Sequence, residues 1–287
     1  MKKYIYSLFA VLLATATMTS CTEEEGSVPG NDAQPNVVMY AYTAKKPYNE
    51  DNDVTLRLAF NNKVEAAYYL AEKASEKDAK LSSMGEEGYM DYVVSNGTKI
   101  ADVASDADLT VTDMYGKYAI TVVAVNGNKK AIAATEFTGL EWEDVVSGTY
   151  YFAVITAMTG ESNPTTLQVC TTNNTLYRFK DVFGKDSHMK IQLMPDYQGK
   201  SADGTYTYFR IPVTVTPYMH ATYGEVSVRD VGYWQGSEAW ITTNGYESGM
   251  YEDYSCFIAA QYYCSGGSFG YGYKGNTKLE YFIADAE

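Results

Sequence analysis

Short runs of alternating hydrophobic and polar residues recur along most of the chain, and they predict strands rather than helices. In the first half, turn residues such as Asn61-Asn62 and Asn126-Gly127-Asn128 separate these runs. Such residues are typical of hairpin connections. The predicted strands of this half are 37–43, 54–60, 64–70, 109–111, 118–125 and 131–137.

One stretch of the first half has a helical spacing of its apolar residues. Within residues 76–94, Gly85 and Gly88 weaken the helical pattern, because glycine is a poor helix former. We therefore expect a short helical insertion between two strands. Its apolar positions are Ala79, Leu81, Met84, Tyr89, Met90 and Val93.

The second half shows no sustained helical period and predicts a second β domain. Within the run 206–216, alternation places Phe209, Ile211, Val213 and Val215 on one face. The segment 141–148 is the expected boundary, which gives domains of 36–141 and 142–287. The predicted strands are 149–156, 166–171, 176–180, 189–194, 206–216, 254–263 and 278–283.

The first 20 residues have the sequence pattern of a bacterial export signal. Lys2 and Lys3 precede an apolar run of about 13 residues, too short to span a bilayer as a helix. Met18-Thr19-Ser20-Cys21 resembles the lipobox of bacterial lipoproteins. That resemblance implies a signal peptide at 1–20, cleavage before Cys21, and a lipid such as palmitate on Cys21. The alternative is an ordinary secretory signal with an incidental cysteine.

Three acidic residues, Glu23, Glu24 and Glu25, come almost directly after Cys21. The polar stretch that follows completes a flexible tether over 21–35. The acidic cluster resembles the export signal of Bacteroidetes-type surface lipoproteins. It implies an outer-membrane protein, lipid-anchored and facing the cell exterior. A merely solvated linker, with the body facing the periplasm, is the alternative.

Both domains resemble known families. The run 118–127, preceded by Leu109, resembles the sixth strand of a fibronectin type III domain, in which Tyr118 is the corner tyrosine whose hydroxyl bonds nearby backbone. The Tyr- and Gly-rich segment 256–273 resembles the C-terminal part of Bacteroidetes surface lipoproteins without an assigned activity. We expect an all-β fold: a fibronectin type III-like sandwich with a short helical insertion, followed by an antiparallel β barrel or sandwich.

The charge balance argues against a nucleic-acid partner. The chain carries a formal charge of -14, and cleavage before Cys21 would remove Lys2 and Lys3, giving -14 - 2 = -16. Phosphate binding needs clustered Lys and Arg, and no basic stripe occurs.

The reactive residue types form no recognisable catalytic or metal-binding motif, and we expect no cofactor. Two histidines, His188 and His220, occur without a hydrolase or metalloprotease motif. The acidic loops 49–53 and 102–108 offer oxygen ligands for calcium but lack the EF-hand spacing, which favours solvated turns. Three cysteines remain after Cys21, and they fit either one disulfide with a free thiol or three buried thiols. They are Cys170, Cys256 and Cys264.

The aromatic residues of the region 218–254 are the candidate ligand-binding residues. Tyr and Trp rings beside polar groups stack on the apolar faces of sugars. The alternative is that these rings fill a barrel end or cover loops. We expect a non-catalytic surface binding module for glycan. A structural or adhesive subunit that docks a surface protein is the second hypothesis, and a glycan-directed hydrolase the third. The candidates are Tyr223, Tyr233, Trp234, Trp240 and Tyr246.

Overall fold

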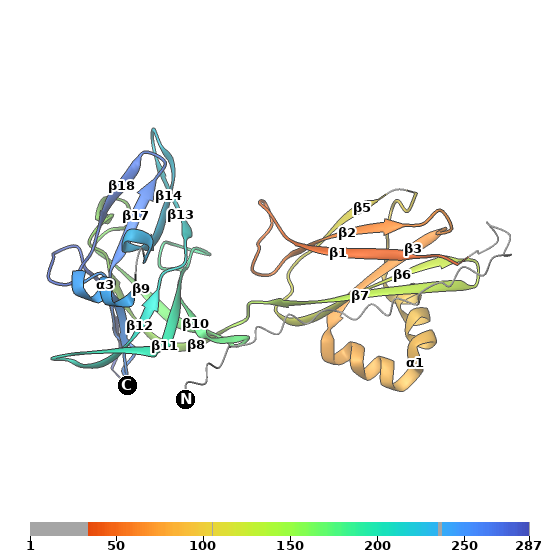
Figure 1. The fold of residues 1–287 in the computed structure, drawn as a ribbon, viewed down its shortest axis with the longest axis horizontal. Helices are drawn as coiled ribbons and strands as arrows, with labels where there is room; N and C mark the ends of the chain where they lie inside the picture. Colours follow the sequence, from red (N-terminus) through yellow and green to blue (C-terminus); the bar gives the residue numbers. More distant parts are fainter. Residues whose placement is uncertain (1–33, 105, 235–236, 287) are drawn as a thin grey trace, which may run out of the picture.

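The computed structural model describes residues 34–104, 106–234 and 237–286 of the chain. Strands dominate both halves (Figure 1), which confirms the predicted all-β class with a helical insertion. Cys21, Glu23, Glu24 and Glu25 lie outside the described residues, so the predictions about them stay predictions.

The N-terminal half is a sandwich of two antiparallel sheets, as predicted. Inward-facing residues such as Leu56, Leu58, Ile120 and Val122 are fully buried between the sheets. One sheet has the order β1 (Val37–Thr43), β2 (Val54–Phe60), β5 (Ala107–Val111), and the other β4 (Thr98–Lys99), β3 (Ala66–Lys73), β6 (Gly116–Asn126), β7 (Lys129–Gly139).

The helical insertion, α1 (Ala74–Asn96), is longer than the short excursion expected. Gly85 interrupts it with a φ of 71°, a left-handed conformation that glycine adopts easily, so the helix turns at this point. Its second half packs Tyr89 and Val93 against Val123, on the face of the four-stranded sheet away from the sandwich core. This sheet is therefore covered on both faces.

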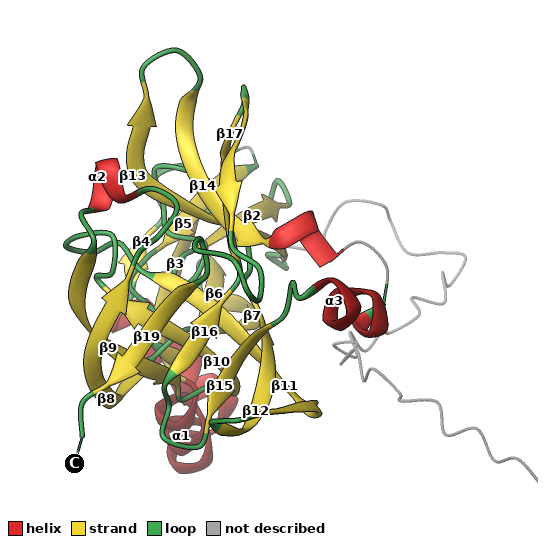
Figure 2. Ribbon diagram, turned by 90° about the vertical axis from the view of Figure 1, so that its left-hand side faces the viewer, coloured by secondary structure: helices red, strands yellow, loops and turns green. Residues whose placement is uncertain are grey.

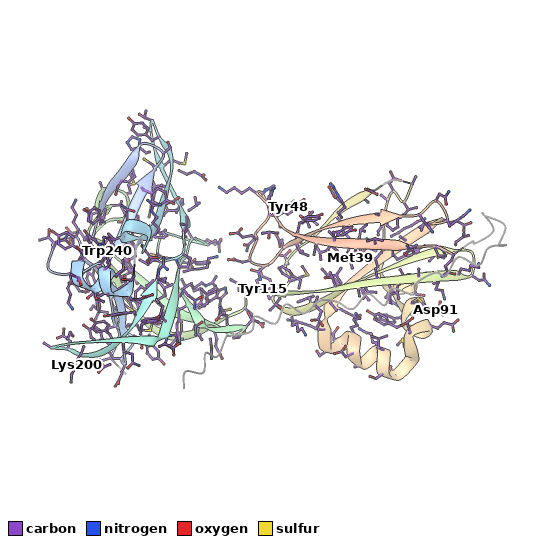
Figure 3. The ribbon with its side chains drawn as sticks, viewed as in Figure 1. Met39, Tyr48, Asp91, Tyr115, Lys200 and Trp240 are labelled. Carbon is purple, nitrogen blue, oxygen red and sulfur yellow. The ribbon has the colours of Figure 1, made fainter. Side chains whose placement is uncertain are left out.

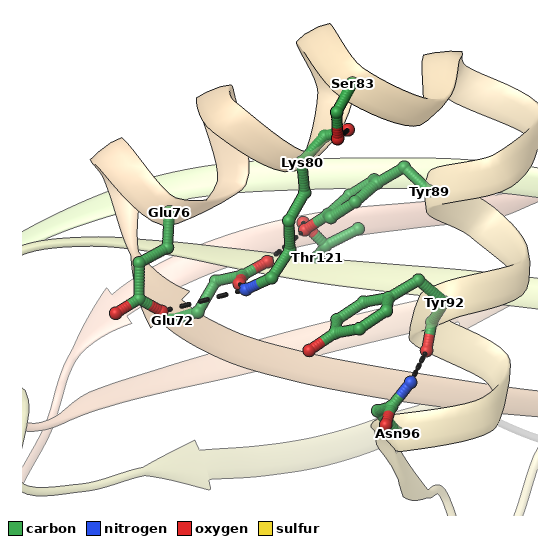
Figure 4. A network of polar contacts seen from close by, with 8 residues as sticks. All are labelled: Glu72, Glu76, Lys80, Ser83, Tyr89, Tyr92, Asn96 and Thr121. Atoms are coloured by element: carbon green, nitrogen blue, oxygen red, sulfur yellow. Dashed lines mark hydrogen bonds and ion pairs between the residues drawn. The ribbon is translucent and has the colours of Figure 1, made fainter.

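A buried polar network ties α1 to the sheet (Figure 4). The Tyr89 hydroxyl donates to Glu72 Oε1 at 2.7 Å and lies 3.2 Å from Thr121 Oγ1, while Lys80 Nζ bonds Glu72 Oε2. Burial raises the pKa of Tyr89 well above its ordinary value, so this phenol stays a hydrogen-bond donor.

The corner role implied for Tyr118 is wrong. Within the described chain its hydroxyl makes no hydrogen bond, and Lys73 Nζ lies 4.8 Å from its ring centroid. Tyr118 packs against the core by its ring instead.

The C-terminal half is a closed antiparallel barrel with a second sheet standing beyond one end (Figure 2). The barrel order is β10 (Asn173–Lys180), β11 (Met189–Ser201), β12 (Gly204–Arg210), β15 (Ser248–Tyr251), β16 (Cys256–Ile258), β19 (Glu280–Ala284), β8 (Trp142–Tyr151), β9 (Ser162–Cys170). The second sheet has the order β13 (Thr214–His220), β14 (Gly224–Asp230), β17 (Ala260–Cys264), β18 (Gly267–Tyr271). The remaining elements are α2 (Thr156–Thr159), η1 (Val231–Trp234) and α3 (Glu238–Asn244).

Barrel and second sheet share one hydrophobic core, because Val226, Val228 and Tyr262 of the sheet pack with Phe179 and Phe209 of the barrel. The C-terminal half is thus a barrel with an added sheet, and the choice between barrel and sandwich is resolved.

Several predicted strand boundaries are wrong because the chain changes sheet. The run 206–216 is two strands, β12 and β13, with Pro212 between them, whose nitrogen cannot donate to a ladder. Phe209 and Ile211 are consequently buried while Val213 and Val215 are exposed. The run 254–263 likewise divides into β16 and β17. The expected boundary segment 141–148 lies almost entirely within β8.

The three cysteines after Cys21 are free thiols, so no disulfide forms among them. Cys170 and Cys256 are buried and Cys264 is partly exposed. Burial raises the pKa of the Cys256 thiol well above its ordinary value, which leaves it a small apolar side chain.

A buried carboxylate, Glu280, connects the parts of the C-terminal domain. Its Oε2 accepts from the hydroxyls of Tyr150 at 2.8 Å and Tyr262 at 2.9 Å. Its Oε1 accepts from the backbone nitrogens of Ala153 at 3.0 Å and Val154 at 3.2 Å. Burial raises the pKa of Glu280, and these four hydrogen bonds partly offset that rise.

The raised pKa of Glu280 predicts a defined dependence of stability on pH. A carboxyl with a folded pKa above its unfolded value binds protons more readily when folded. The contribution of Glu280 to the stability of the fold is therefore full below the ordinary pKa of 4.5, and it decreases as the pH rises through the folded pKa. Glu280→Gln cannot ionise. We therefore expect the free energy of unfolding of this variant, relative to that of the wild type, to increase from about pH 4 to about pH 7.

Urea unfolding followed by circular dichroism at both pH values measures this difference. Glu161→Gln is the matched control, since Glu161 is an exposed carboxylate of the same domain. A difference between Glu280→Gln and wild type that does not change with pH would show the prediction to be wrong.

Candidate functional site

The short helix α3 places two aromatic rings on the outside of the barrel. Ser237 caps its start, accepting from the Trp240 backbone nitrogen at 3.3 Å. At its end Gly245 is left-handed, and Tyr246 N donates to Ile241 O at 3.0 Å, as in a Schellman motif. Because the chain reverses there, Tyr246 returns to Trp240, with ring centroids 5.4 Å apart.

Two further tyrosines reach the same place from the end of β18. Gly272 N donates to Ala260 O at 3.1 Å, and a Cβ on Gly272 would lie 2.4 Å from Lys278 O, so only glycine fits between Tyr271 and Tyr273. The loop is then tied to α3, because Lys274 N donates to Gly245 O at 2.7 Å.

These four residues, Trp240, Tyr246, Tyr271 and Tyr273, form a continuous group that we call the ring patch. Tyr246 is its centre, with its centroid 6.1 Å from that of Tyr271 and 6.2 Å from that of Tyr273. Tyr246 is half-buried, whereas Trp240, Tyr271 and Tyr273 are 41%, 38% and 39% exposed. None of the four side chains has a hydrogen-bond partner among the described residues. Figure 3 shows Trp240 on the flank of the C-terminal domain.

A buried aromatic cluster on the barrel packs against Tyr246, the centre of the ring patch. Tyr206 of β12 packs edge-on against Phe257 of β16, with centroids 4.8 Å apart, on the outer face of the barrel. Gly249 lies between these strands, and a Cβ there would come within 2.5 Å of Tyr206 and 2.6 Å of Phe257. Burial raises the pKa of Tyr208 to about 12, so this neighbouring phenol stays neutral at physiological pH.

One carboxylate next to the ring patch is buried without full compensation. Glu247 directly follows Tyr246 and is only 3% exposed. Its Oε1 lies 3.5 Å from Lys274 Nζ, and its Oε2 has no hydrogen-bond partner among the described residues. Buried polar atoms are normally satisfied, so an orphan carboxylate oxygen is notable here.

The ring patch can therefore offer stacking faces and polar contacts together. Exposed Trp and Tyr rings supply apolar area at a low cost in conformational entropy, and their hydroxyl and indole groups supply hydrogen bonds. Lys274 adds a cationic donor that is half exposed.

The predicted ligand-binding residues only partly come together. Trp240 and Tyr246 are in the ring patch, whereas Tyr223 stacks on His220, with centroids 4.9 Å apart, beside Gly266. Gly266 precedes β18 and Tyr271 ends it, so Tyr223 lies at the far end of that strand. The side chains of Tyr233 and Trp234 lie outside the described part of the chain. Tyr271 and Tyr273 were not among the residues predicted from the sequence, although Gly and Tyr alternate over 270–273.

The remaining candidates have structural partners. Asp53 accepts from the backbone nitrogens of Asn49 and Asp113 at 2.7 and 3.0 Å, so its carboxylate bonds one nitrogen of its own loop and one of the segment after β5. His220 Nδ1 accepts from the nitrogens of Thr222 and Tyr223, each at 3.2 Å. Within the described ranges, no three His, Cys, Asp or Glu side chains gather as metal ligands.

Comparisons with protein-family models, curated proteins and solved structures give no match for this chain. Of the helices in the described residues, none combines the length and apolar character needed to cross a membrane.

Proposed function

We propose that this protein is a lipid-anchored surface lipoprotein that binds glycan through the ring patch without catalysing a reaction. The observation that carries the proposal is the grouping of three exposed rings around Tyr246, with side chains that have no polar partner among the described residues. Contiguous exposed apolar groups often mark a surface that interacts with a ligand or another protein. Sugar rings match them, because a sugar has apolar faces and a rim of hydroxyls.

A second candidate function is docking of a protein partner at the cell surface. Strand β1 is an edge strand, and its outward residues Val38, Tyr40 and Tyr42 are all exposed. Exposed edge strands can pair with a strand of another chain. We rank this function second because it leaves the ring patch without a role.

Binding of polysaccharides to the soluble chain from Gly26 onward tests the glycan proposal. We expect Trp240→Ala and Tyr271→Ala each to weaken binding about tenfold or more, which corresponds to about 1.4 kcal/mol for each lost stacking contact. Isothermal titration against a panel of neutral and acidic polysaccharides gives the affinities. Trp234→Ala, run in parallel, reports whether that ring belongs to the site.

Tyr223→Ala and Tyr281→Ala are the matched controls, since both rings are exposed in the same domain but lie outside the ring patch. Affinity that survives Trp240→Ala and Tyr271→Ala would contradict the proposed site. Binding of no polysaccharide by the wild type would favour the protein-docking function.

The proposed anchor predicts a lipid on Cys21. In a bacterial host that processes lipoproteins, we expect radioactive palmitate to label the wild-type protein but not Cys21→Ser, which should also leave the membrane fraction. Protease added to intact cells should degrade the wild type. Replacing Glu23, Glu24 and Glu25 together by Ala should protect the protein while keeping the label. Labelling of Cys21→Ser would contradict the anchor.

A further inference from the structure

A cleft of about 990 Å³ lies between the two domains, away from the ring patch. The sandwich contributes the loop between β1 and β2 together with Tyr115, and Figure 3 places Tyr48 and Tyr115 at the end of the sandwich that faces the barrel. The barrel contributes Trp142, Arg178 and residues 186–188. Clefts between domains are common ligand sites.

The cleft has a fixed shape because the link between the domains is short and bonded on both sides. Only Leu140 and Glu141 separate β7 from β8. From the sandwich, Asn52 Nδ2 donates to Leu140 O at 2.8 Å, and from the barrel, Thr171 N donates to Glu141 O at 2.8 Å. Lys190 Nζ of the barrel also lies 2.9 Å from both carboxylate oxygens of Asp51 in the sandwich.

The cleft is less acidic than the protein as a whole. Four of its lining residues are basic and three are acidic, whereas the whole chain has 22 basic and 36 acidic residues. The basic residues are Lys45, Lys46, Arg178 and Lys190, and the acidic ones Glu50, Asp51 and Asp186. Lys190 and Lys46 are occupied by ion pairs with Asp51 and Glu225. Among the described residues, neither Lys45 nor Arg178 forms an ion pair, and Arg178 is the one that other side chains hold in place.

Contacts through its Nε and its guanidinium face hold Arg178 in place, and they leave its two Nη atoms available to a ligand. Its plane lies over the Trp142 ring, 4.4 Å from the centroid, and its Nε donates to Gln168 Oε1 at 2.7 Å. Its two Nη atoms make no hydrogen bond to a described residue. Burial lowers the pKa of Arg178, as expected for a cation that is partly removed from water. An oxyanion would fit the fork of these two nitrogens.

His188 supplies a second donor beside Arg178. Its Nδ1 accepts from the backbone nitrogen of Asp181 at 2.9 Å, so the proton of the neutral ring is on Nε2. Burial and the nearby charge of Arg178 lower the pKa of His188. The other charged groups that act on this ring are Asp181, Asp186 and Lys180.

We propose that the interdomain cleft binds a carboxylate-bearing sugar. The Arg178 fork would pair with the carboxylate, His188 Nε2 would donate to the same group, and the exposed rings of Tyr48 and Tyr115 would flank the sugar. This site is separate from the ring patch and does not depend on glycan binding there.

Nuclear magnetic resonance of the two histidines tests the proposal, because the sequence contains only His188 and His220. The probes are trigalacturonate and the neutral trisaccharide maltotriose, added to histidine-labelled chain from Gly26 onward, which keeps every described residue. We expect trigalacturonate to raise the pKa of His188 by about 1, since a bound anion favours the imidazolium form. The His220 signals should stay unchanged, and maltotriose should move neither.

Arg178→Gln should weaken binding of trigalacturonate about tenfold or more. Arg229→Gln is a closely matched control: Arg229 lies 4.1 Å from the Tyr263 ring centroid and donates to Gln261, but it does not line the cleft. Equal loss in both variants, or an unchanged His188 signal in the wild type, would overturn the proposal. If Arg178→Gln does not fold, the wild-type titration decides alone.

Discussion

The buried carboxylate of Glu280 is the constraint on which the C-terminal domain depends. Its four hydrogen bonds join β8, the loop after it, and β17 to β19. The hydroxyl of Tyr262 comes from the second sheet, whereas Tyr150 belongs to the barrel, so one carboxylate connects the two. A buried carboxylate with fewer donors would be costly, and this requirement fixes how the sheet sits on the barrel.

The ring patch follows from that arrangement. Tyr271 ends β18, which pairs with the strand of Tyr262, and Tyr273 lies on the chain between β18 and Glu280. Their loop is therefore fixed at both ends, and Lys274 N ties its middle to the end of α3. Rings held in this way lose little freedom on binding, which favours ligand affinity. The position of the two domains on either side of the cleft depends on another feature, the two-residue link between β7 and β8, which is hydrogen-bonded to both domains.

The sequence predicted the parts of the fold that local pattern determines. The sandwich strands and the insertion follow from alternation and spacing, and the structure confirms them. The changes of sheet were missed: alternation continues through Pro212, so Val213 and Val215 resembled partners of Phe209 although they lie in another sheet. The site was half predicted, since Trp240 and Tyr246 are close in sequence. Tyr271 joins them only through the pairing of β18 in the second sheet and the bond from Lys274 N to Gly245 O, and Glu280 carries no local pattern at all.

A crystal structure with the tightest-binding oligosaccharide would show directly whether the ring patch holds a sugar. We expect a sugar ring stacked on Trp240 or Tyr271, with its hydroxyls bonded to the phenols of Tyr246, Tyr271 and Tyr273. An oligosaccharide bound elsewhere on the protein, with the ring patch open to solvent, would contradict it.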